Sequence, residues 1–392
     1  MKIIVLKIAA VSLALSALLV LLTSRSSANA SLAPQEKTVE QVQKNIKVLT
    51  GMPQSQLIPV MNFMSASMGR RCNFCHVNRS GQWDYASDEK PEKNTAREMI
   101  KMVLDLHKQN FPGATEISCY TCHRGANHPT NLPALPLPIP SPRPAATGGA
   151  GATGAAPPAA PQASPSPTPA PPTADAIFSK YIEAIGGQAK VDSIKSRTIK
   201  GSVAQPNGTI QFESSQAAPD KFYIMATTAQ GTVERGFNGT VGWEKSARGV
   251  RQLSPVEVAN LQGALGLLRH IKLKEQFKST RVRPAEKIGD RPVIMVIGTT
   301  LDDRQERLYF DAESGLLLRR ISYLPTPIGL IPEQIDFADY RDADGVKLPF
   351  SIIVSSIEVG NPVFTRSVSE MKLNTPVDDA KFNRPPAPAP TP

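Results

Sequence analysis

Cysteine is scarce in this chain, which has four in 392 residues. None lies near the N-terminus, and this absence excludes lipid attachment of the bacterial lipoprotein kind. The four that exist are confined to two short segments, RRCNFCHVN from Arg70 and ISCYTCHRG from Ile117. Cysteines serve different purposes in reducing and oxidising compartments, so the compartment has to be inferred before their chemistry.

Aromatic residues are absent and charges are few in residues 128–173, where proline and alanine dominate. Such a composition cannot bury enough apolar surface to fold, and it favours extended polyproline II conformations. This segment is therefore expected to be a disordered linker between two domains, at residues 31–127 and 174–385. The proline-rich end at residues 386–392 is expected to be a disordered tail.

Residues 174–385 lack the patterns of familiar hydrolytic and phosphate-binding sites. They contain no cysteine and a single histidine, His270, and no Ser/His/Asp set, glycine-rich phosphate loop or carboxylate pair stands out. We therefore expect no hydrolytic activity there. The net charge of +10 is spread through both domains among carboxylates, which favours a solvated basic surface over nucleic-acid binding.

The N-terminus has the features of an export signal. Residues 1–30 combine a basic start at Lys2 and Lys7, an apolar run, and a small-x-small cleavage site ending at Ala30. We therefore expect a periplasmic protein whose signal peptide is removed. The alternative is an uncleaved helix that anchors the chain, because the apolar segment approaches the length of about 20 residues that spans a bilayer.

Each cysteine pair belongs to a C-x-x-C-H motif. The two motifs consist of Cys72, Cys75 and His76, and of Cys119, Cys122 and His123. Positions i, i+3 and i+4 share one face of a helical turn, so the three side chains can face one flat object. Two thiols at this spacing suit thioether bonds to the vinyl groups of haem, and the adjacent imidazole suits an axial position on its iron. Two covalently attached haem c groups are therefore expected.

Three other uses of the cysteines explain the pattern less well. A zinc site with two C-x-x-C pairs would not require a histidine after each pair. A thioredoxin-like redox pair would need one motif in a βαβ setting, which the pattern does not indicate. Disulfides are compatible with export but leave both histidines unexplained.

Methionines before the first motif are candidates for the sixth position on an iron. Met61, Met64 and Met68 form one stripe of a predicted short helix, LIPVMNFMSASMG, which Gly69 is expected to end. For any one of these methionines, a place in the hydrophobic core is the plainer interpretation.

A longer helix is predicted before the second motif, with Pro91 in its first turn and a stop at Phe111-Pro112-Gly113. Met99 and Met102 are its sixth-ligand candidates, together with His107 near its end, and spacing alone does not choose among them. The predicted apolar face comprises Ala96, Met99, Ile100, Val103, and Leu106 or His107.

Residues 40–126 resemble the cytochrome c subunit of bacterial photosynthetic reaction centres. The segments that carry the resemblance are NIKVLTGMPQSQLIPVMNFMSASMGRRCNFCH, DEKPEKNTAREMIKMVLDL and ISCYTCHRG. In that family a helix with the axial methionine precedes each C-x-x-C-H motif. The resemblance implies His76 and His123 as proximal ligands, Met61 as the sixth ligand of the first haem, and Met102 as that of the second.

The resemblance implies a carrier of single electrons rather than an enzyme, with redox proteins as donor and acceptor. Members of the family carry four haems, whereas this chain has two motifs, so docking to a photosynthetic reaction centre is an expectation from resemblance alone. One alternative is a dihaem peroxidase, in which one iron keeps or gains an open axial position. Another alternative is a carrier module that binds a hydrophobic ligand and has a redox-sensing haem domain. His/Met ligation of both irons favours electron transfer.

Residues 174–385 read as a helix followed by many short strands, which predicts an α+β unit on a curved antiparallel sheet. The helix ADAIFSKYIEAIGG should end at Gly186, and Ser254 and Glu257 form a capping box for a second helix. The phrases FNGTVGWE, YFDAESGLLLRR and DYRDADGVKLPF resemble the lipoprotein-carrier-like half-barrel family, which implies an apolar ligand for this domain. The aromatic residues expected in its core are Trp243, Phe222, Tyr309 and Phe337.

Overall fold

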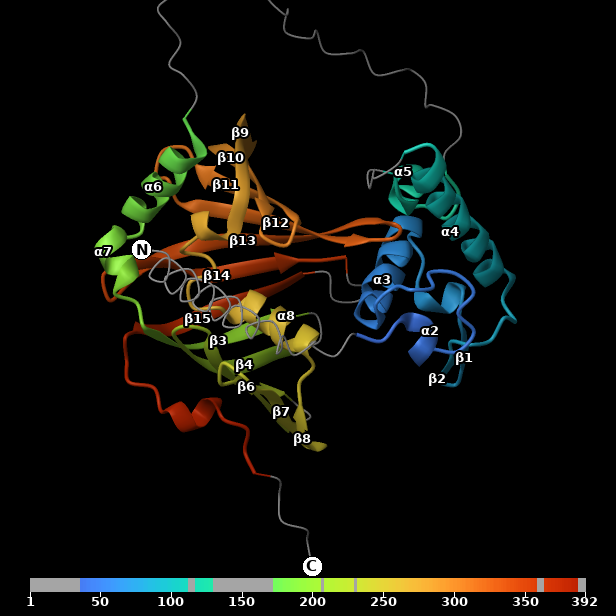
Figure 1. Cartoon of the computed structure of the whole chain (residues 1–392), viewed down its shortest axis with the longest axis horizontal. Helices are drawn as coiled ribbons and strands as arrows, with labels where there is room; N and C mark the ends of the chain where they lie inside the picture. The colour runs from blue at the N-terminus through green and yellow to red at the C-terminus, as the bar shows by residue number, and fades with distance from the viewer. Residues whose placement is uncertain are drawn as a thin grey trace, which may run out of the picture.

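The computed structural model describes residues 36–111, 117–129, 172–205, 208–228, 231–357 and 363–386. The predicted signal peptide lies outside these residues, as do most of the predicted linker and the end of the predicted tail. The described part has a helical N-terminal region and a C-terminal antiparallel sheet region (Figure 1). None of the helices in the described ranges is long and apolar enough to cross a membrane.

Both helices predicted around the cysteine motifs are confirmed. The first, α3, ends at Met68, and Gly69 closes it in the left-handed conformation with a φ of 61°, which glycine adopts without a Cβ clash. The second, α4, has Pro91 at its start, where the missing N–H has no intrahelical partner to lose. The elements of the region are α2 Val39–Val42, α3 Leu57–Met68, β1 Val77–Arg79, β2 Gln82–Asp84, α4 Pro91–Gln109 and α5 Cys119–His123.

The buried face of α4 differs from the predicted one. Ile100 and Val103 are buried as expected, but Met99 is 40% exposed. Lys93 and Arg97 are buried in its place, because their charged ends reach Asp88 at 3.3 and 2.8 Å while their aliphatic stems cover apolar surface. Periodicity alone could not identify these two cations as core-facing, since their partner lies outside the helix.

The sheet region forms one antiparallel sheet of thirteen described strands in the order β8-β7-β6-β5-β4-β3-β15-β14-β13-β12-β11-β10-β9. The first strand of the region, β3, pairs with the last, β15, near the middle of the sheet. The strands are β3 Ser196–Gln205, β4 Gly208–Ala217, β5 Lys221–Thr228, β6 Gly231–Phe237, β7 Gly242–Ser246, β8 Gly249–Gln252, β9 Phe277–Ile288, β10 Arg291–Thr300, β11 Gln305–Asp311, β12 Leu317–Thr326, β13 Gly329–Ala343, β14 Val346–Ser355 and β15 Val363–Leu373.

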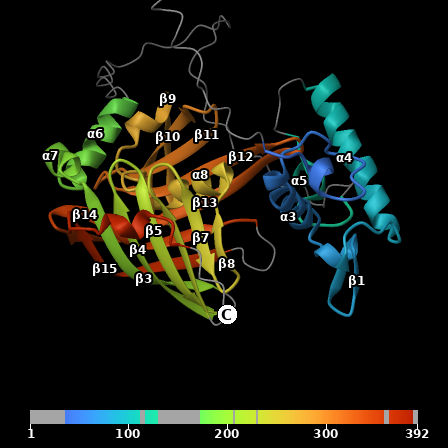
Figure 2. The same cartoon turned by 60° about the horizontal axis from the view of Figure 1, so that its bottom comes forward.

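Three α-helices of the described residues accompany this sheet, which curves around α8 (Figures 1 and 2). They are α6 Ala174–Ala184, α7 Gln188–Asp192 and α8 Pro255–Leu265. The predicted capping box is present at the start of α8, where Ser254 N–H donates to Glu257 at 2.8 Å. The buried residues of α6 join the main core with residues of β11, β13, β14 and β15. The four aromatic residues predicted for the core are all buried.

The hairpin formed by β12 and β13 extends from the sheet and packs against α3 (Figures 1 and 2). Ile328 at its tip is 0% exposed, and Ile331 is 7% exposed. Both belong to a hydrophobic cluster that also contains Val60, Phe63 and Met64 of α3. The sheet region therefore completes the core of the helical region.

The two outer strands of the sheet differ in how they are protected. β8 is short, with four residues. β9 is long, with twelve residues, and its exposed side chains include Lys278, Arg281 and Arg283. Charged side chains on an outer strand oppose pairing with a strand from another molecule.

Ile328→Ala should destabilise the protein by about 2–5 kcal/mol, because it removes a fully buried side chain from a core shared by two regions. Urea unfolding followed by circular dichroism measures this change. Leu301→Ala, at a side chain that is 70% exposed, is the matched control and should change stability by less than about 0.5 kcal/mol. Equal stability of the two variants would show that the hairpin tip does not support the shared core.

Candidate haem-attachment site

The first C-x-x-C-H motif forms a single tight turn directly after α3. Cys75 N–H donates to Cys72 O at 3.3 Å, and His76 N–H donates to the same oxygen at 2.9 Å. Residues Cys72–Phe74 are a 3₁₀ turn, and β1 begins at Val77. The expected helical turn is therefore tighter and shorter than an α-helix, yet it brings both thiols and the imidazole to one side.

A cavity of about 470 Å³ lies between α3, α4 and the first motif. Cys72, Cys75 and His76 line one part of it, and Met61 of α3 lines another. Ile100 of α4 and the side chains of Ile46, Val48 and Leu49 supply apolar surface. The residues predicted to attach and ligate the first haem therefore all line this one cavity. Met64 and Met68 line the same cavity, so all three methionines of the predicted stripe face it.

The environment of His76 favours a neutral imidazole. Burial lowers the pKa of His76, and the nearby charge of Lys93 lowers this pKa further. Its ring meets the ring of Tyr85 edge to face at 5.2 Å. Among the described residues, its buried Nδ1 has no hydrogen-bond partner. Two thiols, this imidazole and methionine sulfurs line one cavity among apolar side chains, and this set of donors fits a covalently attached haem.

The second motif is the short helix α5, which begins directly after Ser118. Ser118 N–H donates to Thr121 Oγ1 at 3.0 Å. His123 Nδ1 lies 3.0 Å from Ala126 O. A carbonyl oxygen only accepts, so Nδ1 carries the proton and donates, which leaves Nε2 free as a metal ligand. This is the tautomer that an axial histidine requires.

The candidates on α4 are placed differently from those on α3. Met99 is 40% exposed and Met102 is 43% exposed. His107 Nε2 lies 2.6 Å from Ile117 O, a contact that joins the end of α4 to the segment before α5. His107 is therefore engaged in a structural hydrogen bond, whereas the two methionine side chains are accessible.

The cysteines are all free thiols. Burial raises the pKa of the Cys75 and Cys119 thiols. In the described residues, no group of three or more His, Cys, Asp or Glu side chains could hold a metal ion. The two cysteine pairs thus do not converge on one tetrahedral site.

The two motifs are held against each other by a backbone contact between α3 and α5. Gly125 N–H donates to Ser67 O at 2.8 Å. A Cβ atom at Gly69 would collide with Gly125 O. Gly69 therefore serves both the left-handed end of α3 and the close approach of the second motif, and sequence analysis identified only the first of these roles.

Asp88 is the centre of a polar network at the edge of the 470 Å³ cavity. Its carboxylate accepts from Lys47 at 2.7 Å and from Arg97 and Asn45 at 2.8 Å. Hydrogen bonds from these groups, Lys47 first, hold the pKa of the Asp88 carboxyl well below its usual range. Lys93 Nζ also donates to Tyr85 O at 2.9 Å, so the network fixes the loop that carries Tyr85 to α4. Nothing local in the sequence marks these partners.

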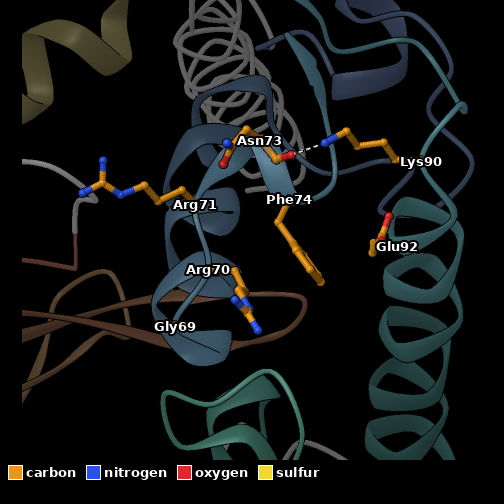
Figure 3. Close-up of a pocket in the computed structure, with 7 residues that line it drawn as sticks. All are labelled: Gly69, Arg70, Arg71, Asn73, Phe74, Lys90 and Glu92. Atoms are coloured by element: carbon orange, nitrogen blue, oxygen red, sulfur yellow. Dashed lines mark hydrogen bonds between the residues drawn. The ribbon is translucent and has the colours of Figure 1, made fainter.

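A second cavity, of about 580 Å³, lies on another side of the first motif (Figure 3). Arg70 and Phe74 point into the space between the end of α3 and α4, and the guanidinium of Arg70 lies 5.2 Å from the centre of the Phe74 ring. Lys90 donates to Asn73 O at the edge of this space. Its lining includes Arg70, Arg71 and Lys90 against a single carboxylate, Glu92, so it is basic.

Residues 20–148 match the family described as photosynthetic reaction centre cytochrome c subunit. The N-terminal region resembles this family. Cytochrome c-554 of Chloroflexus aurantiacus is 36% identical over 95 residues, which are 22% of this chain and 21% of that protein. The photosynthetic reaction center cytochrome c subunit of Rubrivivax gelatinosus is 32% identical over 91 residues, which are 22% of this chain and 23% of that protein. The chain thus spans about a fifth of the length of these curated relatives.

Solved structures similar to this chain match its sheet region. A LolA superfamily protein from Nitrosomonas europaea has 16% identity and a TM-score of 0.41, and the match covers 55% of this chain and 99% of that one. A DUF1329 family protein from Desulfovibrio piger has 14% identity and a TM-score of 0.38, with 53% and 96% covered.

Gly69→Ala should destabilise the helical region by about 2–5 kcal/mol, because left-handed strain and the collision with Gly125 O add together. Gly51→Ala is the matched control, since its φ is 79° but nothing lies within 4 Å of the added Cβ. It should cost only the strain, about 1–2 kcal/mol. Urea unfolding of both variants measures the difference. Equal costs would mean that α3 and α5 do not meet at Gly69.

Proposed function

We propose that the chain is an exported dihaem cytochrome c that transfers single electrons. The observation that carries this proposal is the cavity into which the structure brings Met61, Cys72, Cys75 and His76. The match of residues 20–148 to a family of cytochrome c subunits supports the same chemistry. Haem c would supply a one-electron couple, and this chain would attach, ligate and shield it.

The first haem would be attached through Cys72 and Cys75, with His76 as proximal ligand. Met61 would be its sixth ligand, as the resemblance implies. The absence of a disulfide between the two cysteines and the place of His76 on the wall of the same cavity support this assignment. Histidine with methionine favours the reduced iron and a high reduction potential, which suits electron transfer rather than oxygen binding.

The second haem would be attached through Cys119 and Cys122, with His123 as proximal ligand. The hydrogen bond of His123 Nδ1 supports this role, because it fixes the tautomer whose Nε2 can coordinate. Met102 would be the sixth ligand, and its exposure leaves the sulfur accessible to a bound group. Arg70, Arg71 and Lys90 would suit pairing with propionate carboxylates near the basic cavity.

Redox proteins of the periplasm or membrane would be the partners, with the reaction centre among them only by analogy with the family. The signal peptide at 1–30, the linker at 128–173, and the domain limits at 31–127 and 174–385 remain predictions. The sheet region would hold the cytochrome region in position, because its β12–β13 hairpin packs against α3. The sheet region would also bind an apolar ligand.

A pyridine-haemochrome spectrum and the intact mass should show two covalent haems when the protein is made in a host with a cytochrome c maturation system. Cys72→Ala with Cys75→Ala should remove one haem, and Cys119→Ala with Cys122→Ala the other. Each double variant is the control for the other, because it tests whether one motif works without its neighbour. A wild-type protein without covalent haem would refute the proposal.

Met61→Leu should lower the reduction potential of one haem and abolish one iron–methionine charge-transfer band, because the substitution removes the thioether sulfur. Met64→Leu and Met68→Leu are matched controls, since both side chains line the same cavity. They should leave the band intact and cost less than about 1.5 kcal/mol of stability. Loss of the band in a control instead would transfer the ligand role to that methionine. Peroxide turnover by an oxidised protein with high-spin iron would favour the peroxidase alternative.

A further inference from the structure

The hairpin of β1 and β2 projects from the helical region and lies apart from the sheet region (Figures 1 and 2). Its turn residues, Ser80 and Gly81, have φ angles of 53° and 89°, and two positive values are typical of the type I′ turn that suits the twist of a hairpin. Asn78 pairs with Trp83 across the two strands. A hairpin of two short strands buries little surface of its own, so contacts outside it fix its position.

Two large aromatic side chains of this hairpin and the residue after it are exposed. Trp83 is 42% exposed and Tyr85 is 56% exposed. Their rings lie parallel, with an interplanar angle of 2° and 5.4 Å between the ring centres. Among the described residues, neither ring belongs to a buried hydrophobic cluster. Exposed aromatic groups outside any core are typical of surfaces that bind a partner, where tryptophan and tyrosine supply much of the affinity.

Tyr85 also reaches the inside of the molecule. Its ring meets the ring of His76 edge to face, with 5.2 Å between the ring centres. Tyr85 and His76 both line the 470 Å³ cavity, whereas Trp83 is outside its lining. The rings of Trp83, Tyr85 and His76 therefore form one continuous path from the protein surface to the proposed proximal ligand of the first haem.

Hydrogen bonds hold Tyr85 in this position. Its carbonyl oxygen accepts from Lys93 Nζ at 2.9 Å, and Lys93 is a buried residue of α4. The carboxylate of Asp84 accepts from the N–H groups of Ala86 and Ser87 at 3.1 and 3.0 Å. The loop after β2 is thus tied to the helix that forms one wall of the cavity, so the contact between the two rings does not depend on the hairpin alone.

The charges of the hairpin are already paired. Arg79 forms an ion pair with Glu89, and backbone N–H groups donate to the carboxylate of Asp84. This surface therefore differs from the basic cavity, whose lining includes Arg70 and Lys90. An aromatic surface without unpaired charge suits a partner whose own contact area is apolar and uncharged, and such a contact depends little on salt.

We propose that Trp83 and Tyr85 form the surface on which an uncharged, apolar face of a redox protein docks and exchanges an electron with the first haem. The electron travels between the partner and the haem site across the rings of Trp83, Tyr85 and His76. The partner's redox centre is oxidised as the haem iron is reduced, or the reverse, and no bond forms or breaks. This inference rests on the proposed function and adds to it the place of contact and the chemistry of the partner's surface.

Protein-film voltammetry of the full-length, haem-loaded protein tests the proposal on gold electrodes that carry two different monolayers. A methyl-terminated alkanethiol monolayer represents an apolar partner, and a carboxylate-terminated monolayer represents an acidic one. The wave of the first haem is the one that Cys72→Ala with Cys75→Ala removes. This wave should be reversible on the methyl-terminated monolayer and insensitive to added salt, because the contact is apolar.

Trp83→Ala should weaken adsorption on the methyl-terminated monolayer about five- to tenfold, because it removes an exposed aromatic anchor. A quartz crystal microbalance measures the adsorbed mass, and this readout requires no electron transfer. Phe111→Ala is the matched control, because Phe111 is 44% exposed and follows the C-terminal end of α4. The control should adsorb as the wild type does.

Tyr85→Leu should abolish the reversible wave of the adsorbed protein at scan rates at which the wild type keeps it, because the ring between Trp83 and His76 is removed. Tyr85→Phe keeps the ring and should restore the wild-type response. An aromatic stack that only stabilises the hairpin would give a different result. Tyr85→Leu would then unfold at a lower urea concentration, while the wave of the folded, adsorbed protein would not change.

Faster exchange on the carboxylate-terminated monolayer, with no effect of Trp83→Ala, would assign the contact to the basic cavity and overturn the proposal. Equal adsorption of Trp83→Ala and the wild type would exclude the docking role, and an unchanged wave in Tyr85→Leu would exclude the route. Both side chains are exposed, and the comparison of the two monolayers with wild-type protein stands without either variant. A wild-type protein without covalent haem would contradict the proposed function, whereas two covalent haems with an unaffected wave would contradict this inference alone.

Discussion

The hydrophobic cluster shared by α3 and the β12–β13 hairpin is the contact on which the candidate site depends. α3 carries the three methionines that face the 470 Å³ cavity, and Gly69 at its end leads directly into the first C-x-x-C-H motif. The same helix end meets the second motif through Gly125. The buried side of α3 is covered in part by Ile328 and Ile331, which come from the other region of the chain. The position of both motifs is therefore linked to the sheet through one layer of apolar side chains.

Much of the local structure could be predicted from short patterns, because its causes are local. Gly69 ends α3, Pro91 starts α4, and Ser254 with Glu257 caps α8, since each effect arises within one helical turn. The residues of the two C-x-x-C-H motifs were identified in the same way. Such effects require no knowledge of the tertiary contacts.

Long-range contacts could not be predicted from the sequence. Lys93 and Arg97 are buried because Asp88 and backbone carbonyls satisfy their charges. Periodicity instead predicted that Met99 is buried on this face of α4, where the structure leaves it exposed. The contact of the β12–β13 hairpin with α3 could not be predicted either, because the tip of the hairpin packs into another region of the chain. The cavity brings together α3, α4 and a loop through tertiary packing, so the motif predicted the attachment residues but not their surroundings.

The outer strand β9 has a consequence for how the protein behaves at high concentration. A twelve-residue strand with an open side offers a row of unpaired N–H and C=O groups on which a second molecule could build a continuous sheet. Lys278, Arg281 and Arg283 are exposed along it, so two such strands brought together would place like charges at close range. Growth of ordered fibrils through this strand is thus opposed by repulsion, which weakens as added salt screens the charges.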